Sequence, residues 1–445
     1  MSKLDGYHMM VVSQHFLTVK DFISLEFVCK KFEGNLQKFH YNPVPVDTKT
    51  LKFFSHIETL NICSPKEETF GNVIFDIEPP LNTCLSDRVD FFQICVWCEV
   101  SYALSNFHQS NNSNVIFRNV SYTNTDRRKY GTIIPNVVKR VGVACFSESD
   151  IITIQIPKRV TAIEEFAFYS CQNLTAITLP NNLQHIGAHV FHGCCSLESI
   201  SLPLSVSRIN DNCFSNCCKL KCICLPQQIS NLASCVFIYC TSLQSVTFPS
   251  KIGFIGNCCF KFCEALKNVE IAECLLRVGD SAFYGCYSLT AVTIGSVKEI
   301  GKMCFNKCHS LVNITLPSSL SLLGNGCFRE CTSLRTITLP LCLKEVPNCC
   351  FYFCEKLESV LIPEFVSRLG ESAFNNCTSL STCIIPNSII NIQSYCFSGC
   401  SSLVLDIPST LTSCGDNCFE QCKSVTYKGK KGSRINKCDI CYCYL

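Results

Sequence analysis

Hydrophobic and polar positions repeat with a fixed period over the last two-thirds of the chain. Residues 174–180 read Leu-x-x-Ile-x-Leu-Pro, so apolar and polar side chains alternate up to a proline. This alternation predicts a short, half-buried strand. Proline ends the strand because it cannot donate a ladder hydrogen bond. A second short apolar pair follows in each repeat, as at Ile252 and Ile255. We therefore expect two short strands per repeat.

The motif Phe-x-x-Cys marks the same phase of the pattern in every repeat. It recurs twelve times, 23 residues apart except for two steps of 22, and Phe146 begins the series with Ser149 in place of cysteine. The phenylalanines are Phe168, Phe191, Phe214, Phe237, Phe260, Phe283, Phe305, Phe328, Phe351, Phe374, Phe397 and Phe419. A fixed period of this length predicts a solenoid, in which each rung buries its apolar residues against its neighbours.

The phase of each residue predicts its place in the rung. The phenylalanines should form the spine of the core, and the short segment through Phe-x-x-Cys should form one helical or 3₁₀ turn. Glycine after the second apolar pair suits a turn with positive φ. These glycines are Gly187, Gly256, Gly279, Gly301, Gly324 and Gly370. Ala272, in place of proline, and Gly295 depart from the pattern and predict an irregularity near residues 270–300.

The 39 cysteines follow the repeat and not a disulfide framework. Twelve end the motif, and eight more precede its phenylalanine, where other rungs carry alanine or valine. A position that accepts all three residue types requires a small apolar side chain, as a free buried cysteine provides. Rungs about 4.8 Å apart also bring stacked cysteines within disulfide reach, so bridges remain an alternative.

Composition limits the classes of function. The chain has 445 residues, is 47% hydrophobic and 16% charged, and holds 38 basic against 35 acidic residues. No global positive charge favours nucleic acid. No apolar run is long enough to span a bilayer, and the N-terminus has no apolar signal segment. We expect a cytoplasmic protein with reduced cysteines.

The repeat resembles the BspA-type leucine-rich repeat, which occurs in bacterial surface proteins and in parasitic single-celled eukaryotes. The shared consensus is Leu-x-x-Ile-x-Leu-Pro-x-x-Val-x-x-Ile-Gly-x-x-Ala-Phe-x-x-Cys-x-Ser-Leu, and the likeness covers residues 131–427. The resemblance implies an α/β repeat solenoid, a right-handed superhelix of short strands and single helical turns. It also implies a non-enzymatic role in protein binding and, in some members, adhesion.

The first 40 residues follow a different pattern. Apolar spacings of three and four residues predict short amphipathic helices, and Thr18 can cap the second one. Residues 17–32 resemble an F-box, whose docking positions would fall on Asp21, Phe22, Leu25, Val28 and Phe32. The opening Leu-Pro of that family is missing, because Leu4 is followed by Asp5. The alternative is an α-helical cap on the open end of the solenoid.

Two further segments complete the expected organisation. Residues 41–130 are interpreted as degenerate first repeats or a capping region, with a strand-like stretch at 91–104 that holds the single tryptophan, Trp97. Residues 428–445 form a basic tail with three cysteines. The tail is either a loose terminus or, if its cysteines are acylated, a membrane contact.

No constellation of residues predicts catalysis, a cofactor or a bound metal. Cys95 and Cys98 have redox-motif spacing but lie in an apolar strand-like run. Cys438, Cys441 and Cys443 have no obvious fourth zinc ligand. His185, His189 and His192 fall at turn and surface phases of one rung.

The outward residue between the Ile and the Leu of each rung is the candidate binding face. These residues are Thr178, Ser201, Thr247, Glu270, Thr293, Thr315, Thr338 and Asp406. Threonine is also simply favoured in exposed β structure. We expect an interaction scaffold that binds another macromolecule through this face. The alternatives are an F-box-type substrate receptor of a cullin ubiquitin ligase, docked on a Skp-type adaptor, and a surface-associated adhesion protein.

Overall fold

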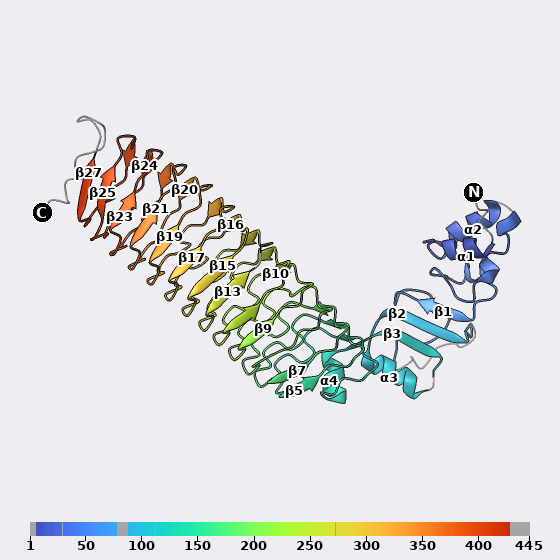
Figure 1. Ribbon diagram of the computed structural model, residues 1–445. Helices are drawn as coiled ribbons and strands as arrows, with labels where there is room; N and C mark the ends of the chain where they lie inside the picture. Colours follow the sequence, from blue (N-terminus) through green and yellow to red (C-terminus); the bar gives the residue numbers. More distant parts are fainter. Residues whose placement is uncertain (1–5, 29, 78–87, 112, 272, 428–445) are drawn as a thin grey trace. The chain divides into compact units, whose positions relative to one another are not determined.

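The computed structural model describes residues 6–28, 30–77, 88–111, 113–271 and 273–427 (Figure 1). The chain divides into two compact units. The N-terminal unit comprises Met1–Gly131 and Pro135–Val141, and the repeat unit comprises Thr132–Ile134 and Gly142–Leu445. None of the described helices has both the length and the apolar character needed to cross a membrane.

The N-terminal unit combines helices with a parallel sheet. Its α-helices are α1 Gly6–Ser13, α2 Val19–Val28, α3 Tyr102–Ser110 and α4 Asn124–Tyr130, and its 3₁₀ helices are η1 Lys30–Phe32, η2 Leu36–Lys38 and η3 Leu51–Phe53. Its strands are β1 Thr59–Ile62, β2 Gln93–Ser101, β3 Val115–Tyr122 and β4 Arg140–Val141, paired in parallel in that order. The expected strand around Trp97 is β2, which ends where Ser101 caps α3.

The two predicted N-terminal helices are present as α1 and α2. The predicted cap is confirmed, because the Asp21 backbone N–H donates to Thr18 Oγ1 at 3.3 Å and the Thr18 N–H donates to Asp21 Oδ2 at 2.9 Å. The core here is an aromatic cluster around Phe22, which is fully buried. Its ring centroid lies 5.1 Å from that of Phe16, 5.6 Å from Phe39 and 5.9 Å from Phe54, all edge-on.

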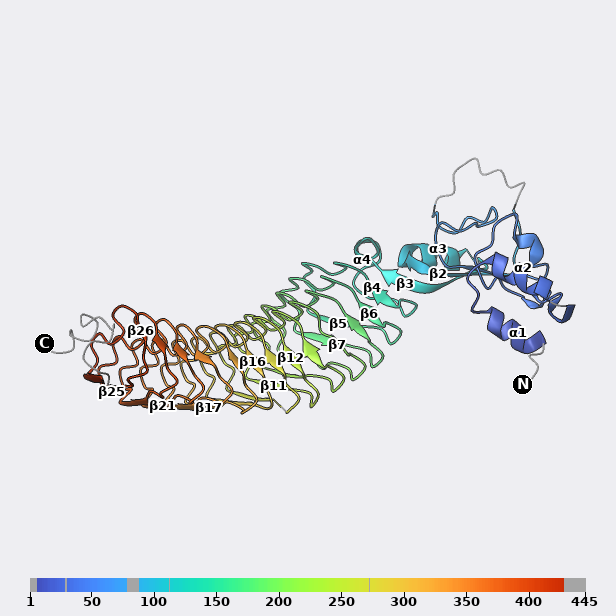
Figure 2. The same ribbon diagram turned by 90° about the horizontal axis from the view of Figure 1, so that it is seen from above.

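The repeat unit contains two rows of strands, shown in Figures 1 and 2. The long strands are β5 Thr153–Gln155, β7 Ala176–Thr178, β9 Cys222–Cys224, β11 Ser245–Thr247, β13 Asn268–Ile271, β15 Ala291–Ile294, β17 Asn313–Thr315, β19 Thr336–Thr338, β21 Ser359–Leu361, β23 Thr382–Ile384, β25 Val404–Ile407 and β27 Ser424–Tyr427. The short strands are β6 Ala162–Ile163, β8 His185–Ile186, β10 Asn231–Leu232, β12 Phe254–Ile255, β14 Arg277–Val278, β16 Glu299–Ile300, β18 Leu322–Leu323, β20 Glu345–Val346, β22 Arg368–Leu369, β24 Asn391–Ile392 and β26 Ser413–Cys414.

Within each sheet of the repeat unit, neighbouring strands come from successive rungs and pair in parallel, although the rows are interrupted between β7 and β9, between β11 and β13, and between β18 and β20. The longest sheet runs from β13 to β27, and the short strands form rows such as β10 to β18 and β20 to β26. Figure 2 shows the long and short rows on separate sides of the coils. The expected two short strands are present in most repeats, whereas the rung around Ser201 forms no strand and only an isolated parallel bridge between Ile186 and Ile209. The repeat unit is a parallel-strand solenoid.

The phenylalanine column is the spine of the core, as predicted. All thirteen rings from Phe146 to Phe419 are fully buried. Neighbouring ring centroids lie between 5.1 and 6.0 Å apart, with interplanar angles between 1° and 15°. Each ring therefore packs face to face on the same residue of the next rung.

The motif cysteines have a role that the sequence did not predict. Each of the twelve thiols donates to the carbonyl oxygen of the phenylalanine one rung earlier, at 3.0 to 3.3 Å. The cysteines before the phenylalanine, such as Cys213, are equally buried. The motif position is therefore a donor position as well as a small apolar one, because the thiol serves an oxygen that water cannot reach.

The predicted helical turn through Phe-x-x-Cys is wrong. No helix occurs among the described residues after α4. The residues two before and two after the phenylalanine adopt left-handed backbone, as at Phe166 with φ 58° and Ser170 with φ 53°. The Tyr169 N–H donates within its rung, to Phe166 O at 3.0 Å, but the Phe168 N–H donates to Val190 O of the next rung at 3.0 Å. Alternate N–H groups thus leave the rung, which excludes a helix.

The glycines after the second strand are required for a reason other than φ. Gly256 lacks positive φ, yet a Cβ atom there would lie 2.3 Å from the Ala233 carbonyl oxygen. The other five positions have the same close approach, with the nearest atom at 2.3 to 2.6 Å. The prediction of positive φ was wrong, and glycine is needed because neighbouring rungs come too close for a side chain.

The irregularity expected near residues 270–300 is absent from the described residues; Ala272 itself lies outside them. β13 and β15 pair over four residues, and β14 and β16 pair over two. The Phe283 and Phe305 rings remain 5.4 Å apart and 1° from parallel. The missing residue of this 22-residue rung lies in the loop at Gly295, between β15 and β16, so both strand rows keep their register.

Candidate binding surface

The long strands present two outward side chains per rung. In strands such as β7, β17 and β19 the middle residue is buried and both flanking residues are exposed. We call the first and third residues of the long strands the outer face. All eight predicted binding residues are exposed. Seven of them belong to this face, whereas Ser201 lies outside any strand.

Strand register brings the predicted residues side by side. Glu270 is aligned with Thr293, and Thr293 with Thr315, across β13, β15 and β17. Thr338 begins the next part of the same column on β19. The structure thus places these side chains in one row, each from a separate rung.

The sequence prediction missed the apolar members of the outer face. Leu361 and Ile384 are aligned with each other and continue the column after Thr338. Their exposed fractions are 59% and 70%, and that of nearby Val404 is 52%. Leu361 and Ile384 stand two residues before a proline, as Thr178 does. Repeat phase alone would have found them, whereas a search for hydroxyl and acidic side chains did not.

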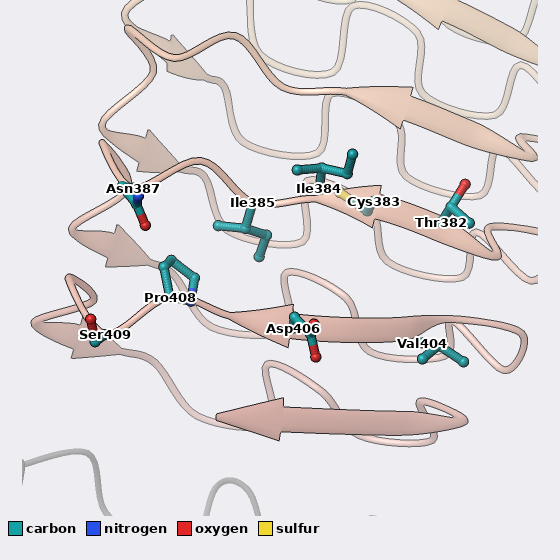
Figure 3. Close-up of a pocket in the computed structure, with 9 residues that line it drawn as sticks. All are labelled: Thr382, Cys383, Ile384, Ile385, Asn387, Val404, Asp406, Pro408 and Ser409. Carbon is teal, nitrogen blue, oxygen red and sulfur yellow. The ribbon is translucent and has the colours of Figure 1, made fainter. Parts of the chain in front are cut away.

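A shallow groove of about 460 Å³ lies at this apolar end of the face. Its lining includes Thr382, Ile384, Val404 and Asp406, and Figure 3 shows these side chains on two neighbouring strands, β23 and β25. Thr382 is aligned with Val404 across these strands, a step of 22 residues that is one shorter than usual. The groove therefore lies at a shortened rung.

The outer face carries little charge. In the described long strands, Glu270 and Asp406 are the only charged residues of this face. The other residues have hydroxyl, amide, thiol or apolar side chains. Charged side chains just before the long strands form ion pairs between rungs. Lys221 Nζ lies 2.8 Å from Glu198 Oε2, and Arg335 Nη1 lies 3.0 Å from Glu358 Oε1. The hydrogen bond from Lys221 lowers the pKa of the Glu198 carboxyl. A partner on this face meets an almost neutral surface.

The residues predicted to dock an adaptor do not form one accessible face. Asp21 caps its own helix, and Phe22 lies in the aromatic cluster with no exposed area. Leu25 and Phe32 are half-buried, and Val28 is 70% exposed. Phe22 is therefore not accessible to a partner, as a docking position of an F-box would have to be. The most exposed apolar side chain of α2 is instead Phe27, at 85%.

The remaining candidate residues have structural surroundings. Cys95 is buried, and burial raises the pKa of the half-buried Cys98 thiol, which opposes redox reactivity. The His189 ring stacks on Phe166 at 4.8 Å, and the His192 ring stacks on Tyr169 at 4.9 Å. Burial, then the neighbouring His189, lowers the pKa of His192. His185 is exposed on β8.

Metal-ligating side chains are not clustered in the part of the chain that the structure describes. No group of three or more His, Cys, Asp or Glu side chains is placed there to hold an ion. The tail cysteines considered as zinc ligands or acylation sites lie at 428–445, outside the described residues.

The repeat pattern matches a known family and solved structures. A family model, the BspA type leucine-rich repeat region in six copies, matches residues 119–244, 234–340 and 298–426. A leucine-rich repeat protein from Bacteroides ovatus is 28% identical, with a TM-score of 0.59 over 65% of this chain and 78% of its own. A leucine-rich cell surface protein from Faecalibacterium prausnitzii is 24% identical, with a TM-score of 0.44 over 68% and 86%. A leucine-rich repeat protein from T. pallidum is 30% identical, with a TM-score of 0.34 over 36% and 77%. No curated protein matches the chain.

Proposed function

The chain belongs to the BspA-type leucine-rich repeat family, and from that premise we propose that it is a non-enzymatic scaffold that binds another protein on its outer face. Repeats of this kind are typical of protein-binding and surface adhesion proteins. A solenoid offers an extended surface and not a convergent pocket. Binding by surface complementarity is the function that this architecture supports best.

One observation carries the proposal: three large apolar side chains lie exposed and close together on a face whose other side chains are mostly small and uncharged. Leu361, Ile384 and Val404 each expose more than half of their surface. Clustered exposed apolar groups mark protein interaction sites more often than scattered ones do. The groove beside Ile384 gives a partner side chain a place to insert. The partner should present an apolar, weakly charged surface to this end of the face.

A matched pair of substitutions tests the proposal. Ile384→Arg places a charge at the centre of the apolar end, whereas Ile390→Arg changes the same residue type, 50% exposed, beside short strand β24. Proteins captured by the full-length chain are identified by mass spectrometry. Partners should be lost with Ile384→Arg and retained with Ile390→Arg. The proposed face is contradicted if both variants lose the partners equally, or if neither variant loses them.

Salt dependence provides an independent test of the same site. An almost neutral contact should bind with similar affinity between about 0.05 and 0.5 M salt, because there is little charge to screen. A strong loss of affinity with salt would contradict the apolar site and would indicate binding through charged residues such as Lys221 and Arg335.

A second candidate function rests on the exposed apolar side chains of the N-terminal helices. Phe27 and Val28 on α2 are 85% and 70% exposed, and Leu17 just before it is 85% exposed. These residues could serve an F-box-like segment that docks a Skp-type adaptor of a cullin ubiquitin ligase. In that case Phe27→Glu should abolish co-purification of adaptor and cullin, while Ile384→Arg should leave it intact. Absence of the adaptor from the wild-type complex would remove this candidate.

A further inference from the structure

Four half-exposed cysteines differ from the buried thiols of the core. Cys195 and Cys218 each follow a motif cysteine, in neighbouring rungs. Cys235 and Cys258 each lie two residues before a motif phenylalanine, again in neighbouring rungs. Both pairs therefore occupy equivalent positions one rung apart, where solvent can reach them.

The first pair shares a hydrogen-bond acceptor. The Cys195 Sγ and Cys218 Sγ atoms each lie 3.5 Å from the same oxygen, the carbonyl of Asn216. Later in the same column, the rings of Tyr287 and His309 stack with centroids 5.1 Å apart. Side chains in this column therefore lie next to one another across the rung boundary, and the two sulfurs are close neighbours.

The second pair has equivalent backbone geometry. Cys235 and Cys258 both have left-handed backbone, with φ 58° and 54°. The Cys235 N–H donates at 2.9 Å to the carbonyl of Asn257, the residue before Cys258. Earlier in this column the Phe166 and His189 rings stack at 4.8 Å. Hydrogen-bonded parallel backbones lie about 4.8 Å apart, within the Cα separation that a disulfide accepts.

We propose that Cys195/Cys218 and Cys235/Cys258 are two dithiol sites that close to disulfides when a peroxide oxidises them, each linking two neighbouring rungs. One thiolate attacks a peroxide oxygen and becomes a sulfenic acid, while the other oxygen of hydrogen peroxide leaves as water. The partner sulfur then attacks the sulfenic sulfur, the S–S bond forms, and a second water leaves. Two thiols and one hydrogen peroxide give one disulfide and two waters.

The buried core thiols should not take part. They have no exposed area on which an oxidant could act, and burial raises the pKa of motif thiols such as Cys217 and Cys263 well above the usual value. Burial also raises the pKa of Cys218 and Cys235, but both remain accessible. The reaction should accelerate as the pH rises, since the thiolate is the nucleophile.

Cys349 provides a control within the same column as Cys235 and Cys258. It is also half-exposed and left-handed, with φ 53°. Its column neighbours one rung away are Gly326 and Ser372, so it has no thiol beside it. Peroxide should convert Cys349 to a sulfenic acid that a dimedone reagent traps, without an intramolecular cross-link.

The test treats the full-length, reduced protein with hydrogen peroxide, alkylates the remaining thiols in denaturant and maps disulfides by mass spectrometry. We expect four thiols per chain to be lost to disulfides, recovered as Cys195–Cys218 and Cys235–Cys258 cross-links, in addition to uncrosslinked oxidation of single accessible cysteines such as Cys349. Cys218→Ser should abolish only the first cross-link and Cys258→Ser only the second, each leaving a dimedone-reactive cysteine. The proposal is overturned if the pairs remain uncrosslinked, or if motif cysteines oxidise before them in the folded protein.

Discussion

The two units build their cores in opposite ways. In the N-terminal unit, Phe22 contacts Phe16, Phe39 and Phe54 edge-on, and each ring has a different environment. In the repeat unit, thirteen phenylalanines make the same parallel contact from rung to rung. The first core depends on a single arrangement of unlike contacts, and the second repeats one contact many times. A change in free energy that is the same in every rung therefore adds up along the repeat unit.

Alkaline pH should separate the units most strongly. Burial raises the pKa of thiols throughout the repeat core, including Cys217, Cys263 and Cys304, above the usual value of 9.0. A folded-state pKa above the unfolded one gives stability that is complete below pH 9 and is lost as the pH rises. For each such thiol, the free energy of unfolding falls by about 1.4 kcal/mol per pH unit between the unfolded and the folded pKa. Summed over the rungs, this should unfold the repeat unit soon above pH 9.

Two optical signals distinguish the units in that experiment. Far-UV circular dichroism follows the many strands of the repeat unit, and the emission of Trp97, the single tryptophan, follows the N-terminal unit. The dichroism should change first as the pH rises from 8 to 11 in the presence of reductant. Coincident transitions, or a repeat unit stable at pH 11, would contradict the expectation that its thiols are buried and protonated.

Removing one ring should destabilise the repeat unit locally. Phe283→Ala should cost about 3–5 kcal/mol, as expected for a large buried aromatic side chain. Phe22→Ala should cost a similar amount in the N-terminal unit, because that ring is equally buried. Urea unfolding followed by dichroism should report the first substitution, and Trp97 emission the second. An unchanged midpoint for Phe283→Ala would mean that the phenylalanine column is not the core spine.

The glycines allow a matched test of rung spacing. Gly256→Ala places a Cβ 2.3 Å from the Ala233 oxygen, whereas the nearest atom to a Cβ at Gly253 is 3.7 Å away. Overpacking of this kind costs about 1–3 kcal/mol, so Gly256→Ala should lower the urea midpoint. Gly253→Ala should leave it nearly unchanged. Equal effects would contradict the close approach of neighbouring rungs.

The smallest expected difference is between a cysteine that ends the Phe-x-x-Cys motif and a cysteine that directly precedes its phenylalanine. Cys286→Ala removes the thiol that donates to Phe260 O at 3.2 Å, and loss of a hydrogen bond costs about 1 kcal/mol in addition to lost packing. Cys304→Ala should cost less, because alanine occupies the same position at Ala282 and Ala373. Thermal unfolding of both variants tests the order. A larger effect at Cys304 would mean that packing outweighs the thiol donor.

The sequence predicted the parts of the fold that depend on repeat phase. The two strands, the proline after the long strand and the buried phenylalanine column follow from side-chain type alone. The left-handed turns could not be predicted in this way, because residues as different as Phe166, His189 and Met303 share the same positive φ. The hydrogen bonds to the next rung impose that conformation, and no single residue type marks it.

The candidate surface was predicted in position but not in chemistry. The phase of Thr178 and Thr315 correctly indicated exposed, aligned side chains. The apolar end at Leu361 and Ile384 was missed because hydrophobic residues were expected to be buried. In the N-terminal unit, the burial of Phe22 depends on Phe39 and Phe54. Such tertiary contacts between distant residues leave no periodic pattern in the sequence.

The equivalence of neighbouring rungs has a genetic consequence. Excision of residues 238–260 would join Phe237 to Lys261-Phe262-Cys263 and restore a complete Phe-x-x-Cys motif at the junction. The motif phenylalanines and motif cysteines on either side of the junction would then meet the partner type they had before. Recombination between copies of the repeat can therefore lengthen or shorten the gene by whole units while it preserves the motif contacts of the core. The number of rungs is a property that inheritance can vary independently of the fold.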